Sequence, residues 1–104
     1  MYLSLAGPAV ELVDSKNFGE FYVDAAGRPL PQIAGALNRQ SAGTIRGGHA
    51  WIDIAYIESE LTLAGGNWQE PFETMLAYAQ SRDWVSRQVG RGAVRAHIEN
   101  IETG

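Results

Sequence analysis

The sequence predicts an α+β domain: a sheet of four to five mostly antiparallel, possibly mixed, strands, with one principal helix at about residues 68–82 packed on one face. Two observations lead to this class. Apolar and polar residues alternate at residues 46–58 and 93–101, as in strands that bury one face. Between these segments, apolar residues recur at helical spacing. With 104 residues and no internal repeat, the chain is expected to form a single domain, residues 1–104.

The N-terminal quarter predicts two strands joined as a β-hairpin. Residues 9–14 (AVELVD) and 20–25 (EFYVDA) have the composition of strands, and the SKNFG between them contains the turn formers Asn17 and Gly19. A short strand over residues 2–5 is expected to precede this hairpin.

Residues 26–43 are expected to form an arm outside the sheet, because Pro29 and Pro31 prevent regular ladder pairing. The run PQIAGALNR is suited to two helical turns with Pro31 at the first position. Gly35 weakens such a helix by about 1 kcal/mol relative to alanine. Two roles are open for this arm: a lid, or a segment that packs on the core.

The segment RGGHAWIDIAYIE, residues 46–58, predicts one long strand. Its even positions form an apolar face, and its odd positions place His49, Trp51 and Asp53 together on the other. The pair Gly47 and Gly48 predicts a bulge or a sharp bend just before this alternation.

Residues 67–84 give the clearest helical pattern. Asn67 is the expected N-cap, with Glu70 three residues later in capping-box spacing. Pro71 is tolerable only in the first turn, so the helix is expected to start between Asn67 and Glu70. Its apolar stripe consists of Phe72, Met75, Leu76 and Ala79.

The helix stripe needs an apolar partner, and this requirement sets the register of the strands. Burial of each isoleucine or valine contributes roughly 1.5–3 kcal/mol, whereas burial of an unpaired charge costs several kcal/mol. The face turned away from the helix is therefore expected to carry the polar and aromatic positions. These are His49, Trp51, Asp53, Arg95, His97 and Glu99, joined by Tyr22 if the first strands follow the same rule.

Composition excludes several classes of function. A formal charge of −4 and a pI near 5.0 argue against a nucleic-acid partner. Without cysteine, the chain has no disulfide and no Cys-ligated metal centre. The N-terminal residues resemble neither a signal peptide nor a membrane span, so we expect a soluble cytoplasmic protein without a membrane partner. Seven arginines against one lysine suggest a GC-rich bacterial gene.

No metal or cofactor is expected. His49 and Asp53 would lie about 13 Å apart on a strand, too far to share one ion. His97 and Glu99, about 7 Å apart along the strand, would need a third ligand from a neighbouring strand. The segment SRQVGRG offers Arg87 and Arg91 to an anion, although solvated arginines are the more ordinary interpretation.

Two functional hypotheses follow for the polar face. The first is a small binding module, expected to be a homodimer, that uses Trp51, Arg95, His97 and Tyr22. A basic protein or a small anionic ligand is a further possible partner. The second is a cofactor-free enzyme of the proton-transfer or isomerase type. Its candidate catalytic residues are His97, His49, Asp53 and Glu99, with Arg95 as anion anchor.

Both hypotheses depend on contacts that the sequence leaves open. If the two strands are antiparallel with Asp53 opposite His97, Trp51 faces Glu99 and a small pocket follows. A tryptophan at the middle of a half-polar sheet face calls for a covering layer. The cover of Trp51 is the arm of residues 26–43, a second copy of the chain, or a foreign partner.

Overall fold

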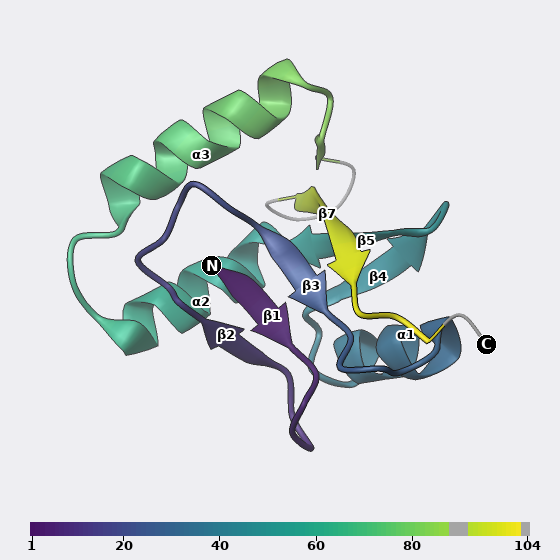
Figure 1. Ribbon diagram of the computed structural model, residues 1–104. Helices are drawn as coiled ribbons and strands as arrows, with labels where there is room; N and C mark the ends of the chain where they lie inside the picture. The colour runs from purple at the N-terminus through teal and green to yellow at the C-terminus, as the bar shows by residue number, and fades with distance from the viewer. Residues whose placement is uncertain (88–91, 103–104) are drawn as a thin grey trace.

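The computed structural model describes residues 1–87 and 92–102. Within them the chain forms a mixed seven-stranded sheet and three helices, so the predicted α+β class is confirmed (Figure 1). The expectation of four to five mostly antiparallel strands with one principal helix is wrong, because parallel pairs also occur and two further helices supply core residues. The strands are β1 (Tyr2–Ser4), β2 (Glu11–Val13), β3 (Tyr22–Asp24), β4 (Gly43–Arg46), β5 (His49–Asp53), β6 (Val85–Ser86) and β7 (Ala93–Glu99), and the helices are α1 (Leu30–Arg39), α2 (Ile54–Ala64) and α3 (Gln69–Ser81).

The strand order is β2-β1-β3-β7-β5-β4, and β6 pairs with β7 beside this path. β1 lies between β2 and β3, antiparallel to the first and parallel to the second. The predicted hairpin of β2 with β3 is therefore wrong, although a turn does follow β2, where the Asn17 N–H donates to the Asp14 carbonyl at 3.0 Å. The parallel pairing sets the fully buried Leu3 beside the fully buried Val23, so both reach the core.

The predicted strand at residues 46–58 is wrong at both ends. Gly47 and Gly48 have φ values of 58° and 79° and form a two-residue turn between β4 and β5. Two successive positive φ angles are typical of a type I′ hairpin turn, which glycine adopts without strain. The sharp-bend alternative for this glycine pair is thus the one observed. At its other end, β5 stops at Asp53 and the chain turns into α2.

Helix α2 was missed because its apolar spacing imitates the preceding strand. Ile52 on β5 and Ile54 on α2 are both fully buried, so the alternation continues across the boundary by coincidence. From Ile54 onwards, however, the buried residues are Ile57 and Leu61, which is helical spacing. The helix ends at Gly65, whose φ of 83° suits glycine.

The arm of residues 26–43 contains helix α1 and packs on the core. Pro29 occupies the N-cap and Pro31 lies in the first turn, so neither removes a helical hydrogen bond. Ile33, Ala36 and Leu37 are buried, and the helix contacts β4. Of the two roles that the sequence left open, the arm therefore has the packing role, and it does not cover Trp51.

Helix α3 is present where the sequence predicts it. Phe72, Leu76 and Ala79 are buried, and Met75 is partly buried. The expected capping by Asn67 is wrong: the N-cap residue is Trp68, and no side chain caps the helix. The ring of Trp68 instead packs edge-on against that of Phe72, with 6.0 Å between ring centroids.

Strand β7 joins the two parts of the sheet. Its C-terminal half pairs in parallel with β3, and its N-terminal half pairs antiparallel with β5. The side chains that face the helices are Leu3, Val23, Ala50, Ile52, Val94 and Ala96, each at most 2 % exposed. The predicted register, with aliphatic side chains toward the helices and polar side chains away from them, is thus confirmed for β5 and β7.

The contact between α2 and the N-terminal strands gives a pH-dependent prediction. The Tyr56 hydroxyl donates to the Val10 carbonyl at 3.4 Å. Burial, assisted by the negative charges of Glu60 and Glu11, raises the pKa of Tyr56 from 10.0 to about 12. In the unfolded chain this phenol ionises near pH 10, so the native state holds the proton more tightly and loses stability between about pH 10 and 12.

We therefore expect Tyr56→Phe to remove the last tyrosine to ionise when the absorbance at 295 nm is followed through alkaline pH. The variant should also lose less stability than the wild-type chain over this pH interval. Unchanged titration curves would contradict this prediction.

Candidate functional site

One face of the sheet has no helix packed across it among the described residues. We call it the open face. In Figure 1, α1 and α2 lie behind the sheet, and α3 runs along its upper end. The strand registers place the following side chains on the open face: Tyr2, Ser4, Tyr22, Asp24, Thr44, Arg46, His49, Trp51, Asp53, Arg95, His97 and Glu99.

An aromatic row crosses the middle of the open face. The rings of Tyr2 and Tyr22 stack with 4.9 Å between centroids, and Tyr22 stacks on His97 at 5.6 Å. His49 continues the row on β5, one step beyond the pairing of Ala50 with Ala96. Desolvation, followed by the negative charge of Glu99, raises the pKa of Tyr22, so this phenol stays neutral well into alkaline pH.

A second row alternates arginine and tryptophan. Arg46 lies over the indole of Trp51, with its Cζ 4.5 Å from the ring centroid. Arg95 is the register partner of Trp51, and its Cζ lies 5.3 Å from the ring of Trp84. Cations over indole faces are attracted by the ring quadrupole and hold the ring in place. The half-buried Trp51 is therefore held by Arg46 from β4, and no second layer of the described residues covers it.

Two acidic side chains of the open face, Asp24 and Glu99, lie on the other side of the aromatic row. Asp24 and Glu99 are partners across β3 and β7. The His97 Nε2 lies 3.1 Å from the Glu99 Oε1. Arg95 precedes Glu99 by four residues on β7, about 13 Å at the usual rise per residue. Along β7, Arg95 thus lies on one side of the aromatic row and Glu99 on the other, and Asp53, the partner of Ala93, adds a carboxylate beyond Arg95.

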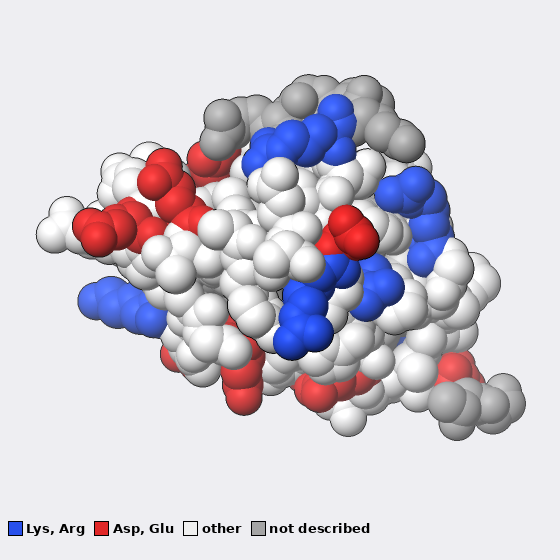
Figure 2. Space-filling model, turned by 90° about the horizontal axis from the view of Figure 1, so that it is seen from above, with Lys and Arg blue, Asp and Glu red and all other residues white. Residues whose placement is uncertain are grey.

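Charge is also unevenly distributed over the end of the molecule that carries α3. Figure 2 looks down on the end of the molecule that carries α3. A group of Asp and Glu side chains occupies one side of this view, and most of the Lys and Arg side chains spread over the middle and the opposite side, where further Asp and Glu side chains lie among and below them. A field of this kind orients an approaching partner.

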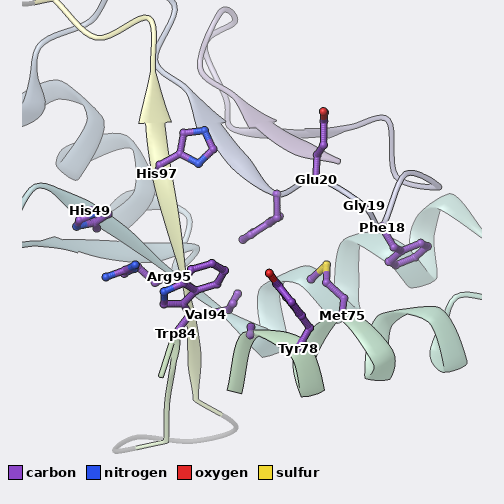
Figure 3. A pocket seen from close by; sticks show the side chains of 12 residues that line it. Phe18, Gly19, Glu20, His49, Met75, Tyr78, Trp84, Val94, Arg95 and His97 are labelled. Carbon is purple, nitrogen blue, oxygen red and sulfur yellow. The ribbon is translucent and has the colours of Figure 1, made fainter. Parts of the chain in front are cut away.

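Beside the open face, the sheet contains a gap that we call the fork hollow. β3 and β6 pair with different stretches of the same edge of β7, so they diverge from each other. The space between them is a hollow of about 290 Å³, closed on one side by α3 (Figure 3). Its apolar lining includes Phe18, Phe21, Met75, Tyr78 and Trp84, and its polar lining includes Glu20, His49, Arg95 and His97.

The structure brings together some of the predicted catalytic residues and separates others. His97 and His49 line the same hollow, and Glu99 contacts His97. The expected pairing of Asp53 with His97 is wrong, because Asp53 lies opposite Ala93. Asp53 therefore lies about 13 Å along β5 from the position opposite His97. It serves as the N-cap residue of α2 instead.

The same register corrects the predicted neighbour of Trp51. Its partner on β7 is Arg95 and not Glu99. Tyr22 is confirmed on the open face, next to His97. Arg87 falls within the described part of the chain, whereas its predicted companion Arg91 lies outside it.

Sequence reasoning missed several aromatic residues around this site, among them Tyr2, Tyr78 and Trp84. Tyr2 joins the aromatic row, and its alternation with the buried Leu3 was a usable signal. Tyr78 and Trp84 meet edge-on at 6.0 Å between ring centroids, although they lie on either side of the end of α3. No periodicity in the sequence indicates that contact, because it depends on how the chain turns after α3.

The chemistry available here is that of imidazole, carboxylate and guanidinium. His97 and Glu99 are positioned for proton exchange, but their side chains are 59 % and 47 % exposed, so water competes at both groups. Within residues 1–87 and 92–102, no group of three or more His, Asp or Glu side chains is placed to hold a metal ion. No described helix is both long and apolar enough to cross a membrane.

Comparison with protein-family models, with curated proteins and with solved structures found no match to this chain.

Proposed function

We propose that this chain is a small protein-interaction module that pairs with a second copy of itself through the open face. The observation that carries the proposal is the position of Trp51. Its indole lies in the middle of a sheet face, partly exposed, while the arm that was its candidate cover packs on the core instead. Indole surface left at the centre of a sheet face favours a partner that covers it.

The composition of the open face supports binding of a protein. Tryptophan, tyrosine and arginine are the residues most enriched among those that dominate interface energies. Trp51, Tyr22, Arg46 and Arg95 lie on neighbouring strands of this face. Stacking and cation–π contacts already hold the side chains in place, so docking costs little side-chain entropy.

The charge arrangement favours a second copy as the partner. Consider a two-fold axis that lies in the interface and crosses β7 at His97. It places Arg95 of one copy over Glu99 of the other, twice, and packs the aromatic row onto itself. A symmetric interface needs such self-complementarity. A strongly basic partner is disfavoured, because Arg46 and Arg95 flank Trp51.

Trp51→Ala tests this proposal. In sedimentation equilibrium, the wild-type chain should be a dimer at micromolar concentrations, and the variant should dimerise at least about 30-fold more weakly, as for loss of a central tryptophan. Circular dichroism should show an unchanged fold. Leu63→Ala is the matched control: Leu63 is 80 % exposed on α2, away from the open face, and its removal should leave the dimer intact. A wild-type chain that stays monomeric at millimolar concentration would rule the proposal out.

A charge exchange gives an independent readout of the pairing. Arg95→Glu and Glu99→Arg should each weaken the dimer, because each places like charges against each other across the two-fold axis. The double variant should recover a large part of the affinity. Additive losses in the double variant would show that Arg95 and Glu99 do not meet across the interface.

The contact between His97 and Glu99, beside Arg95, favours a second candidate function, a cofactor-free proton-transfer enzyme. A histidine oriented by a carboxylate is a suitable general base. We place this function second because both groups lie at the surface and Asp53 does not reach them.

A further inference from the structure

We infer that the fork hollow is a binding site for a small organic monoanion, specifically a carboxylate attached to an aromatic or similar apolar body. The inference goes beyond self-association and does not rest on it. It stands on the size of the hollow, on its apolar lining, and on the basic side chains that line one of its sides.

The body of the ligand follows from the lining. Phe18, Phe21, Met75, Tyr78 and Trp84 contribute aromatic and thioether surface from three separate segments of the chain. The volume of about 290 Å³ lies near the lower end of the range for small-molecule sites, roughly 300–1,000 Å³. One six-membered ring with a short side chain suits a space of this size. A ring placed there would meet the edge-on pair of Tyr78 and Trp84, an arrangement that favours a further aromatic ring.

The charge of the ligand follows from the other side of the hollow. Figure 3 shows His49, Arg95 and His97 on one side and Phe18, Met75 and Tyr78 on the other. The Arg95 guanidinium is directed away from the middle of the hollow, so it reaches a ligand there by a change of rotamer. Among the described residues, Arg95 makes no ion pair with a carboxylate, and its guanidinium lies against the ring of Trp84. A guanidinium next to apolar surface binds a carboxylate through two parallel hydrogen bonds. The imidazoles of His49 and His97 offer further N–H donors on the same side.

A single negative charge fits this hollow better than a phosphate or a dicarboxylate. Glu20 contributes to the rim, and its carboxylate points away from the middle of the hollow in Figure 3. Glu99, in contact with His97, adds a second negative charge nearby. These two groups repel additional anionic charge, and Arg95 is the one guanidinium in the described lining.

The test uses 3-phenylpropionate as the probe and 3-phenylpropanamide as its neutral counterpart, titrated into ¹⁵N-labelled protein. We expect saturable shifts at the Trp84 indole N–H and the backbone amides of Arg95 and His97, with a Kd of roughly 0.1–1 mM for a ligand of this size. The amide should bind at least about tenfold more weakly, because it has no negative charge and cannot form the bidentate ion pair with Arg95.

Arg95→Met should weaken 3-phenylpropionate binding at least about tenfold while leaving the amide almost unaffected. Arg39→Met is the matched control, because Arg39 is exposed on α1 outside the hollow, and it should change the Kd less than about twofold. The inference is overturned if the amide binds as tightly as the acid, if Arg95→Met has no effect, if the shifts map elsewhere, or if no shift occurs up to about 10 mM.

Repeating the titration on Trp51→Ala separates this inference from the proposed dimer. Trp51 is outside the lining of the hollow. Arg95 and His97 also face the second copy in the proposed dimer, so dimerisation competes with the probe, and this variant should bind it at least as tightly as the wild-type chain. Loss of the dimer with retained binding would support both statements, and a monomeric wild-type chain that still binds the probe would reject only the dimer.

Discussion

Gly43→Ala is expected to destabilise the fold by about 3 kcal/mol or more. A Cβ atom at Gly43 would lie 2.2 Å from the backbone oxygen of Trp51 and 3.0 Å from the Cα of Ile52. These are backbone atoms of the paired strand, so no rotamer change relieves the overlap, and β4 must move away from β5. For a small domain with a total stability of about 5–15 kcal/mol, this is a large fraction.

Urea unfolding followed by circular dichroism measures this effect. Gly7→Ala is the matched control, because a Cβ there has its nearest atom, the Ala9 oxygen, at 3.9 Å. The control should stay within about 0.5 kcal/mol of the wild-type chain. Equal unfolding midpoints for Gly43→Ala and the wild type would show that β4 and β5 can move apart at Gly43 without loss of stability. The substitution also bears on the open face, because Gly43 adjoins the strand segment that carries Trp51.

Phe72→Ala is expected to cost about 3–5 kcal/mol. Phe72 is 1 % exposed and is the largest of the fully buried side chains. Its ring also meets Trp68 edge-on, and that contact is lost with it. Shortening it leaves a cavity beneath α3 that the neighbouring helices cannot fill without moving. Glu73→Ala, at an exposed position of the same helix, should change stability by no more than about 0.5 kcal/mol.

The same variant connects stability with the fork hollow. Met75, Tyr78 and Ala79 line the hollow from α3, the helix that Phe72 anchors. A loosened helix should therefore weaken probe binding even under conditions where most molecules remain folded. Wild-type stability in Phe72→Ala would mean that α3 is held mainly by other contacts, and it would remove this link.

Patterns that repeat within one element could be predicted from the sequence, and patterns that depend on distant pairing could not. The stripe of Phe72, Leu76 and Ala79 identifies α3 because each of these residues faces the same core. The alternation along β7 identifies its polar face for the same reason: a slip of one residue would bury Arg95 and His97.

The errors arose where local signals agree with two structures. Ile54 is buried as the first residue of α2, but it also continues the strand pattern from Ile52, and Asp53 gives no side-chain cap that marks the change. Which strands pair with each other also could not be predicted, because that depends on residues far apart in the sequence. Nothing in the residues around His97 indicates that His49, and not Asp53, lies across from it, because that depends on where β5 begins after the Gly47–Gly48 turn.

One consequence of the topology concerns how the open face responds to a partner. β7 is bonded along one edge to both β3 and β6 and along the other to β5. The two halves of the sheet therefore share a strand and cannot rotate against each other without breaking its backbone hydrogen bonds. A sheet held in this way is preorganised. It has its bound conformation before the partner arrives, so little conformational entropy is lost on binding.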